Sequence, residues 1–144
     1  MSAVLDAPQE TSPATVPDSV SPLEAWELFS SGRAKLVDVR TREELIFVGQ
    51  VPGSLNVPWA TGTSLIRNPR FARELEAKLG GKTQRVLLLC RSGKRSALAL
   101  EVARNAGFTQ VSNVREGFEG ELDERQQRGH IGGWRSHGLP WTQD

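Results

Sequence analysis

The apolar and polar positions of the chain follow two kinds of pattern in turn. Residues 86–89 form an unbroken apolar run, which is typical of a strand that is covered on both faces of a sheet. Residues 34–40, 55–57 and 108–114 are also predicted as short strands, and stretches with helical spacing of apolar residues separate them. Strands that alternate with helices predict an α/β fold, with a parallel sheet and helices on both faces.

Pairs of residues typical of helix starts mark where the helices begin. Ser21 and Glu24, and again Thr41 and Glu44, have the spacing of a capping box. In that motif each side chain accepts a hydrogen bond from the backbone N–H of the other residue. A later helix is predicted over residues 96–106, directly after the loop that follows the apolar run.

The start of the chain differs in composition from the rest. Residues 1–20 are rich in Ala, Pro, Ser and Thr, which predicts a flexible or surface-draped tail. With 144 residues in all, we expect one domain over residues 21–144. The stretch at about residues 119–132 is rich in Glu, Asp, Arg and Gln, and we interpret it as an extra polar segment of that domain.

Composition and charge exclude several classes of protein. The net charge of +1 gives no global basic field for nucleic acid, and no apolar run approaches the roughly 20 residues of a membrane span. The N-terminus lacks the pattern of a secretory signal, and a single cysteine fits a reducing compartment, so a cytoplasmic location is expected. One cysteine and two histidines do not make a zinc site, and we expect no metal and no cofactor.

The single cysteine, Cys90, begins a loop between the apolar run and the helix that follows. Arg91, Lys94 and Arg95 follow it within five residues. A helix start leaves backbone N–H groups unpaired, and these groups favour an anion. Together with the cations they favour the thiolate, which is the nucleophilic form of cysteine. The alternative is a buried structural cysteine. Three neighbouring cations argue against it.

This loop resembles the active-site loop of the rhodanese-type sulfurtransferases, whose pattern is Cys-Arg-x-Gly-x-Arg/Thr. Cys90, Arg91, Gly93 and Arg95 match it position by position. The resemblance implies a rhodanese-like fold with a central parallel sheet of about five strands. It also implies that Cys90 takes a sulfane sulfur from thiosulfate or a persulfide and passes it to a thiol, on a small molecule or a protein, or to cyanide.

Two further stretches carry the same resemblance. Residues 47–59 resemble the family's Gly-His-Ile-Pro-Gly-Ala-x-Asn-Ile-Pro segment, with Gln50 in place of the histidine. The family does not need that histidine for sulfur transfer. Residues 117–120 and 134–140 resemble the family's C-terminal pattern, with the polar segment between them, and we expect this region to lie beside the active-site loop.

Each residue of the loop has an expected role. The N–H groups of residues 91–95 are expected to hold the terminal sulfur of a Cys90 persulfide. Arg91 and Arg95 are expected to attract an anionic donor. Asp38 and Arg40 resemble a family feature and are expected to support the loops around the site rather than to take part in the chemistry. The remaining predicted substrate-binding residues are Ser92, Gly93, Lys94 and Ser96, of which Ser96 can instead cap the helix.

Two other functions stay open. Some cysteine phosphatases and arsenate reductases share this fold, but cysteine phosphatases have one more residue between cysteine and arginine than the four between Cys90 and Arg95. Phosphate needs a wider loop than a single sulfur does. Rhodanese-like domains also serve as docking or regulatory modules, although those often lack the cysteine. His130 and His137 are interpreted as surface residues, because a thiolate needs no general base.

Overall fold

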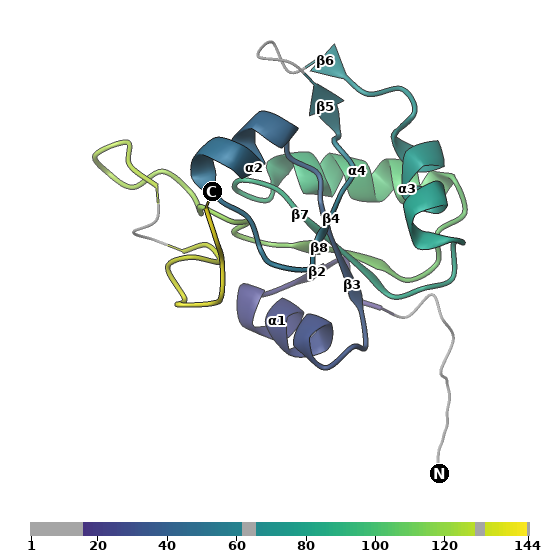
Figure 1. Ribbon diagram of the computed structural model, residues 1–144, viewed down its shortest axis with the longest axis horizontal. Coiled ribbons are helices and arrows are strands. Elements are labelled where there is room, and N and C mark those ends of the chain that lie inside the picture. The colour runs from purple at the N-terminus through teal and green to yellow at the C-terminus, as the bar shows by residue number, and fades with distance from the viewer. Residues whose placement is uncertain (1–15, 62–65, 129–131, 144) are drawn as a thin grey trace.

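A five-stranded parallel sheet forms the centre of the molecule (Figure 1). The computed structural model describes residues 16–61, 66–128 and 132–143. The sheet has the strand order β2-β8-β7-β3-β4, and every neighbouring pair is parallel. Its strands are β2 (Ser19–Val20), β3 (Lys35–Asp38), β4 (Leu55–Asn56), β7 (Val86–Leu89) and β8 (Val111–Val114). The α/β fold with a central parallel sheet predicted from the sequence is therefore confirmed.

Helices cover both faces of the sheet. Helix α1 (Pro22–Ser30) lies on one face, and α3 (Phe71–Leu79) and α4 (Lys94–Asn105) lie on the other (Figure 1). All four residues of β7 are buried and alternate between two cores: Val86 and Leu88 belong to the α3/α4 side, whereas Leu87 and Leu89 belong to the α1 side. Because both faces of β7 pack against apolar residues, this run shows no alternation of apolar and polar positions.

Both predicted capping boxes are present. Ser21 and Glu24 exchange hydrogen bonds at the start of α1, and Thr41 and Glu44 do so at the start of α2 (Arg42–Val48). Helix α4 begins two residues earlier than predicted, at Lys94. Its cap is therefore a glycine rather than a serine.

Strand β2 lies within the segment that the sequence analysis assigned to the tail. Its two residues pair with β8 at one edge of the sheet, and Val20 is buried. A two-residue strand is too short for its periodicity to be recognised in a proline-rich stretch. Just before β2, the carbonyls of Pro17 and Asp18 accept hydrogen bonds from the Ser112 side chain and the Asn113 N–H. The rest of the predicted tail, residues 1–15, lies outside the described residues.

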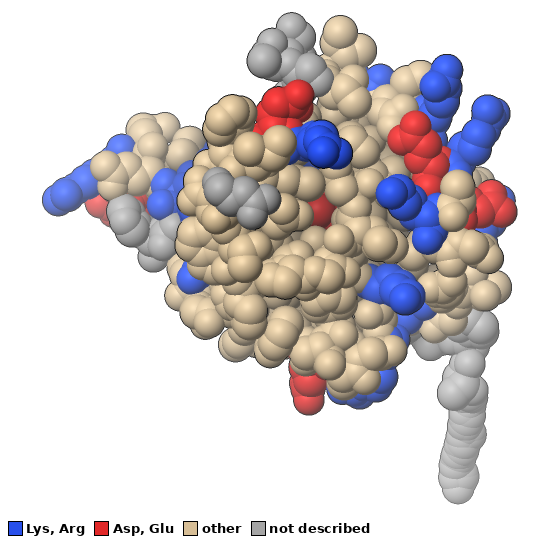
Figure 2. Space-filling view, viewed as in Figure 1, with Lys and Arg blue, Asp and Glu red and all other residues tan. Residues whose placement is uncertain are grey.

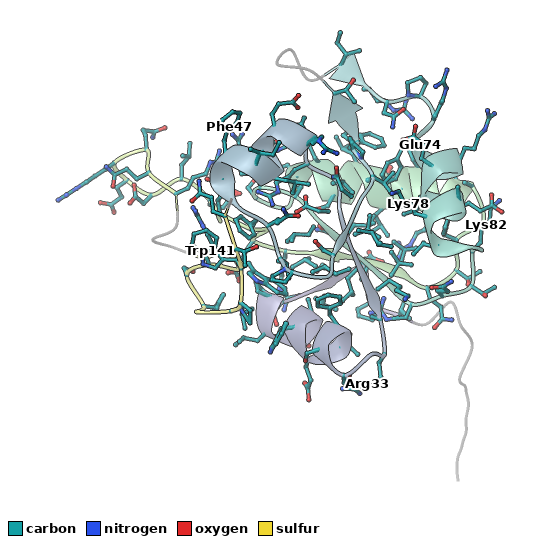
Figure 3. All side chains as sticks on the ribbon, viewed as in Figure 1. Arg33, Phe47, Glu74, Lys78, Lys82 and Trp141 are labelled. Atoms are coloured by element: carbon teal, nitrogen blue, oxygen red, sulfur yellow. The ribbon has the colours of Figure 1, made fainter. Side chains whose placement is uncertain are left out.

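Two features outside the sheet were not anticipated. Strands β5 (Ala60–Thr61) and β6 (Ile66–Arg67) form an antiparallel pair beyond the end of β4. The C-terminal residues also fold back onto α2: Gln50 and Thr142 form a β-bridge, and the Gln143 side chain donates to the carbonyl of Phe47. Phe47 and Trp141 consequently lie on the same side of the molecule (Figure 3).

On the face shown in Figure 2, Lys and Arg form separate groups interspersed with Asp and Glu. Within the described ranges, no helix is both long enough and apolar enough to cross a membrane.

Trp134 packs the C-terminal region into the core on the α1 side of the sheet. Its side chain is 0% exposed, packs edge-on against Trp26 and donates from Nε1 to the carbonyl of Pro140 at 2.8 Å. Trp134→Ala is expected to lower the free energy of unfolding by about 3–5 kcal/mol, because it leaves a large cavity. Urea denaturation measures the loss. Trp141→Ala, at a side chain that is 39% exposed, is expected to cost clearly less, and equal losses would contradict this assignment.

Candidate active site

The side chain of Cys90 lies at the carboxyl end of β7, where the chain turns into α4. In parallel sheets this end of the strands is where ligands bind. Two backbone N–H groups donate to the sulfur, that of Gly93 at 3.1 Å and that of Ser96 at 3.3 Å. Gly93 is the N-cap residue of α4 and Ser96 lies in its first turn, where backbone N–H groups have no partner within the helix. The residue as a whole is 1% exposed, so its sulfur lies at the floor of the loop.

Gly93 gives the loop its shape. It precedes α4 in the left-handed conformation, with φ 101° and ψ −7°, which glycine adopts without steric cost. The glycine of the sequence motif therefore allows the chain to turn its N–H groups toward the sulfur.

Ser96 is a second polar neighbour of the sulfur rather than the helix cap. Its side chain is fully buried, and its hydroxyl lies 3.3 Å from Sγ of Cys90 and within hydrogen-bond distance of Oδ1 of Asn113. A hydroxyl has a single proton, so it donates to one of these two acceptors at a time. Asn113 comes from the neighbouring strand β8, and the sequence analysis had not singled it out.

Arg95 contacts a carboxylate from another part of the chain. Its NH1 and NH2 groups donate to the two oxygens of Glu44 at 2.7 and 2.8 Å. Glu44 also accepts from the backbone N–H of Thr41 at 3.1 Å, as part of the capping box of α2. Arg95 is expected from the sequence to attract an anionic donor, but both terminal nitrogens of its guanidinium already bind a carboxylate of the same chain.

The ion pair shifts the pKa of both partners. Burial alone would raise the pKa of Glu44, but hydrogen bonds from Arg95 and Thr41 and the charges of Arg95 and Arg40 outweigh it and lower this pKa to about 2. The hydrogen bond to Glu44 raises the pKa of Arg95 against the effect of burial, with smaller contributions from the charges of Glu44, Cys90 and Asp38. Glu44 is therefore a carboxylate across the physiological pH range.

The other two cations of the loop face solvent. Arg91 and Lys94 are exposed, and among the described residues neither is paired with a carboxylate. Ser92 is half-buried between them. Both side chains are therefore in contact with solvent, whereas Arg95 is only partly exposed and is paired with Glu44.

Residues 117–120 support the loop through backbone hydrogen bonds. The N–H of Phe118 donates to the carbonyl of Cys90 at 2.7 Å, and the N–H groups of Glu119 and Gly120 donate to the carbonyl of Arg91 at 2.9 and 3.2 Å. Residues 117–120, at the start of the polar segment, therefore lie beside the loop, as predicted. The described part of that segment, up to residue 128, forms no helix or strand.

Residues 133 and 134 in turn hydrogen-bond to residues 116 and 117. Trp134 donates from its backbone N–H to the carbonyl of Gly117 at 2.8 Å. Glu116, with φ 72°, accepts from the N–H of Gly133 at 2.9 Å and lies 3.0 Å from Nε2 of His137. His137 is therefore a structural neighbour of Glu116, and His130 lies outside the described residues.

Asp38 and Arg40 form a buried ion pair next to Phe118. Both side chains are 0% exposed, and NH2 of Arg40 donates to Asp38 at 2.8 Å and to the carbonyl of Gly49 at 2.8 Å. The guanidinium lies 4.3 Å from the centre of the Phe118 ring. The pair thus contacts Phe118, whose backbone N–H donates to the Cys90 carbonyl.

The chain belongs to the rhodanese family. The Rhodanese-like domain matches residues 21–124. The thiosulfate:glutathione sulfurtransferase of Homo sapiens is 33% identical over 109 residues, which cover 74% of this chain and 94% of the human protein. The chloroplastic thiosulfate sulfurtransferase 16 of Arabidopsis thaliana is 31% identical over 127 residues, covering 87% of this chain and 92% of the plant protein.

Solved structures show the same fold. The crystal structure of Rv0390 from M. tuberculosis is 41% identical in sequence and matches with a TM-score of 0.78, covering 90% of this chain and 100% of that one. The rhodanese-like domain of the Anabaena protein Alr3790 is 16% identical, and its TM-score of 0.62 shows the likeness of fold. The predicted membership of the rhodanese family is confirmed.

The low pKa of Glu44 predicts a specific loss of stability in acid. Because its pKa is depressed in the folded protein, the ion pair stabilises the fold fully above the unfolded pKa of about 4.5, and this contribution is lost as the pH falls through about 2. We expect a contribution on the order of 1–2 kcal/mol, allowing for partial exposure to solvent. Urea denaturation between pH 6 and 2 should show a steeper loss for the wild type than for Glu44→Gln. Parallel curves would contradict the prediction.

Gly117 is expected to tolerate no side chain. A Cβ there would lie 2.5 Å from the Cys90 carbonyl oxygen and 2.6 Å from the carbonyl carbon of Arg91. Gly138 has a similar φ, 74° against 65°, but nothing lies within 4 Å of its Cβ position. Gly117→Ala should therefore destabilise the protein by at least about 1 kcal/mol more than Gly138→Ala, which carries only the backbone strain. Urea denaturation compares the two, and hydrogen exchange of the Phe118 amide should quicken only in Gly117→Ala.

Proposed function

We propose that this protein is a sulfurtransferase that moves a sulfane sulfur from thiosulfate or a persulfide to a thiol acceptor, or to cyanide, through a persulfide on Cys90. The observation that carries the proposal is the pair of N–H groups, of Gly93 and Ser96, directed at the Cys90 sulfur from the start of α4. They stabilise negative charge on sulfur, which both the thiolate and the persulfide carry.

In the first half of the reaction the Cys90 thiolate attacks the outer sulfur of the donor. A new S–S bond forms to Cys90, and the S–S bond of the donor breaks. Its electron pair leaves with sulfite, or with a thiolate when the donor is a persulfide. The burial of Cys90 favours a donor that presents a single sulfur at its tip, because a wider group would displace the loop.

In the second half an acceptor thiolate attacks the outer sulfur of the Cys90 persulfide. The acceptor becomes a persulfide, and Cys90 leaves as a thiolate. Because the chain has one cysteine, no internal thiol can complete this step, and the acceptor must come from outside. The two half-reactions predict ping-pong kinetics.

The exposed cations at the loop entrance suit an anionic donor. Arg91 and Lys94 carry unpaired charge there, and we assign to them the attraction of thiosulfate. Arg95 has its charge compensated by Glu44, so its assigned role is to fix the loop. A small thiol such as glutathione, or a protein thiol, is the proposed acceptor in a reducing cytoplasm, in keeping with the activity named for the human relative.

Two observations favour this reaction over phosphate chemistry. Cysteine-based phosphate transfer needs a guanidinium that binds the oxyanion in a bidentate manner, and here the fork of Arg95 is bound to Glu44. The residue one position further along, where such an arginine would stand, is the buried Ser96. A docking module without chemistry would not need N–H groups directed at a thiol.

Mass spectrometry after exposure to thiosulfate tests the proposal. The wild type is expected to gain the mass of one sulfur atom, and a thiol added afterwards should remove it. Cys90→Ser should gain nothing and should lose at least about 10³-fold in transfer rate while keeping its fold, because it lacks the nucleophile. The lone cysteine makes the site of addition unambiguous.

A wild type that takes up no sulfur, or a serine variant that keeps its turnover, would overturn the proposal. A chromogenic phosphate ester tested in parallel is expected to remain intact. Its hydrolysis by the wild type, and not by Cys90→Ser, would favour the phosphatase alternative.

A further inference from the structure

Asn113 is a polar residue on an apolar face of the sheet. It follows Val111 by two residues along β8, so both side chains point to the same face, and Val111 belongs to the core on the α3/α4 side. Asn113 is only 9% exposed. Burying an amide costs free energy unless it is hydrogen-bonded, so an asparagine at this position needs a polar partner.

The partner of Asn113 is the hydroxyl of Ser96, which also lies beside the sulfur. Oδ1 of Asn113 is within hydrogen-bond distance of Ser96 Oγ, and Oγ lies 3.3 Å from Sγ of Cys90. Ser96 is 0% exposed, which limits competition from water. The three side chains therefore form a row from the sulfur to the amide, in which two acceptors share one hydroxyl proton.

The charge on the sulfur decides which acceptor is the stronger one. A thiolate is ionised and attracts the Ser96 hydroxyl more strongly than a neutral amide oxygen does. In a persulfide on Cys90 the negative charge lies on the outer sulfur, so Sγ is neutral and a weak acceptor. The better acceptor for the hydroxyl is then Oδ1 of Asn113.

An asparagine suits both states because the two ends of its amide differ. When the Ser96 hydroxyl points at the sulfur, the lone pairs of Oγ face Asn113, and an oxygen there would repel them. A half-turn of the amide about χ2 brings Nδ2 to the same place, where it donates to Oγ. No described residue accepts a hydrogen bond from Nδ2 of Asn113, so no such bond opposes the turn.

We propose that Asn113 is a positioning residue for sulfur transfer, whose amide turns to direct the Ser96 hydroxyl toward Sγ of Cys90 in the thiolate and away from it in the persulfide. The hydroxyl keeps its proton throughout, and the turn makes and breaks no covalent bond. The inference rests on the proposed function, because the charge on Sγ alternates in this way only if Cys90 is loaded and discharged.

Hydrogen exchange of the Asn113 side-chain amide tests the inference without any turnover. Cys90→Ala removes the sulfur, so the Ser96 hydroxyl donates to Oδ1 and Nδ2 has no bond to Oγ. At pH 8 the Nδ2 protons of Asn113 are expected to exchange with water at least about fivefold faster in Cys90→Ala than in the wild type, because one hydrogen bond protects them there. NMR saturation transfer from water measures both rates.

Ser96→Ala shows whether the effect passes through the hydroxyl. In this background Cys90→Ala should change the exchange of the Asn113 Nδ2 protons by less than about twofold, because no hydroxyl remains to bond them. Equal exchange in the wild type and Cys90→Ala would overturn the inference. So would a difference that persists undiminished without the Ser96 hydroxyl.

Asn113→Leu removes both ends of the amide at a similar volume. The persulfide form then leaves the Ser96 hydroxyl without an acceptor, whereas the thiolate form keeps the hydroxyl bond to the sulfur. The ratio of the rate of sulfur uptake to the rate of discharge is therefore expected to fall about fivefold, and less than about twofold in the Ser96→Ala background. Single-turnover mass spectrometry measures both rates.

A matched variant controls for the loss of a buried polar group from β8. Ser112→Ala removes a hydroxyl that donates to the carbonyl of Pro17 and should leave the ratio within about twofold of the wild type. An unchanged ratio in Asn113→Leu, or an equal fall in Ser112→Ala, would overturn the inference. If Asn113→Leu does not fold, the exchange measurement decides alone, because it leaves Asn113 in place.

The two experiments also separate this inference from the proposed function. If the wild type takes up sulfur from thiosulfate but the exchange at Asn113 is the same in Cys90→Ala, the role of Asn113 fails and the sulfurtransferase stands. If the wild type takes up no sulfur while the exchange differs as expected, the proposed function fails, and the response of the Asn113 amide to the sulfur remains.

Discussion

The arrangement of the active-site loop depends on backbone N–H groups that a helix start cannot pair internally. In most helices a side chain or water satisfies them. Here Gly93, in a left-handed conformation, turns the chain so that its own N–H and that of Ser96 are directed at the Cys90 sulfur. The cysteine side chain thus accepts the hydrogen bonds that a capping side chain would accept at the start of α4.

That geometry is held from two sides. On one side residues 117–120 bond the carbonyls of Cys90 and Arg91, and Trp134 bonds Gly117 in turn. On the other side Glu44 connects α2 to Arg95 through a bidentate ion pair. The first support uses neutral backbone groups and does not depend on pH, whereas the second is electrostatic. The loop thus combines a frame of backbone hydrogen bonds with one charged contact.

The sequence was sufficient to predict the features that are contiguous along the chain. The apolar run of β7, the turn at Gly93 and the start of α4 follow one another directly, so their local patterns located Cys90 at the end of a buried strand. The partner of Arg95 could not be predicted, because Glu44 is 51 residues away and its capping box already explained its spacing. The position of residues 117–120 beside the loop was expected from the resemblance, but the backbone hydrogen bonds that they make leave no side-chain signature. Strand β2 is too short to show a pattern.

The close contact of Gly120 with Gly132 and Gly133 has a consequence for how this protein can diverge. A Cβ on Gly120 would lie 2.3 Å from the carbonyl oxygen of Gly132, so the two chains touch through bare backbone at the base of the polar segment. Among the described residues, the hydrogen bonds to the loop around Cys90 come from outside residues 121–128. Insertions and deletions beyond it would change the outline of the surface while the reaction centre stays fixed, so this junction is a natural place for relatives to acquire different outer loops.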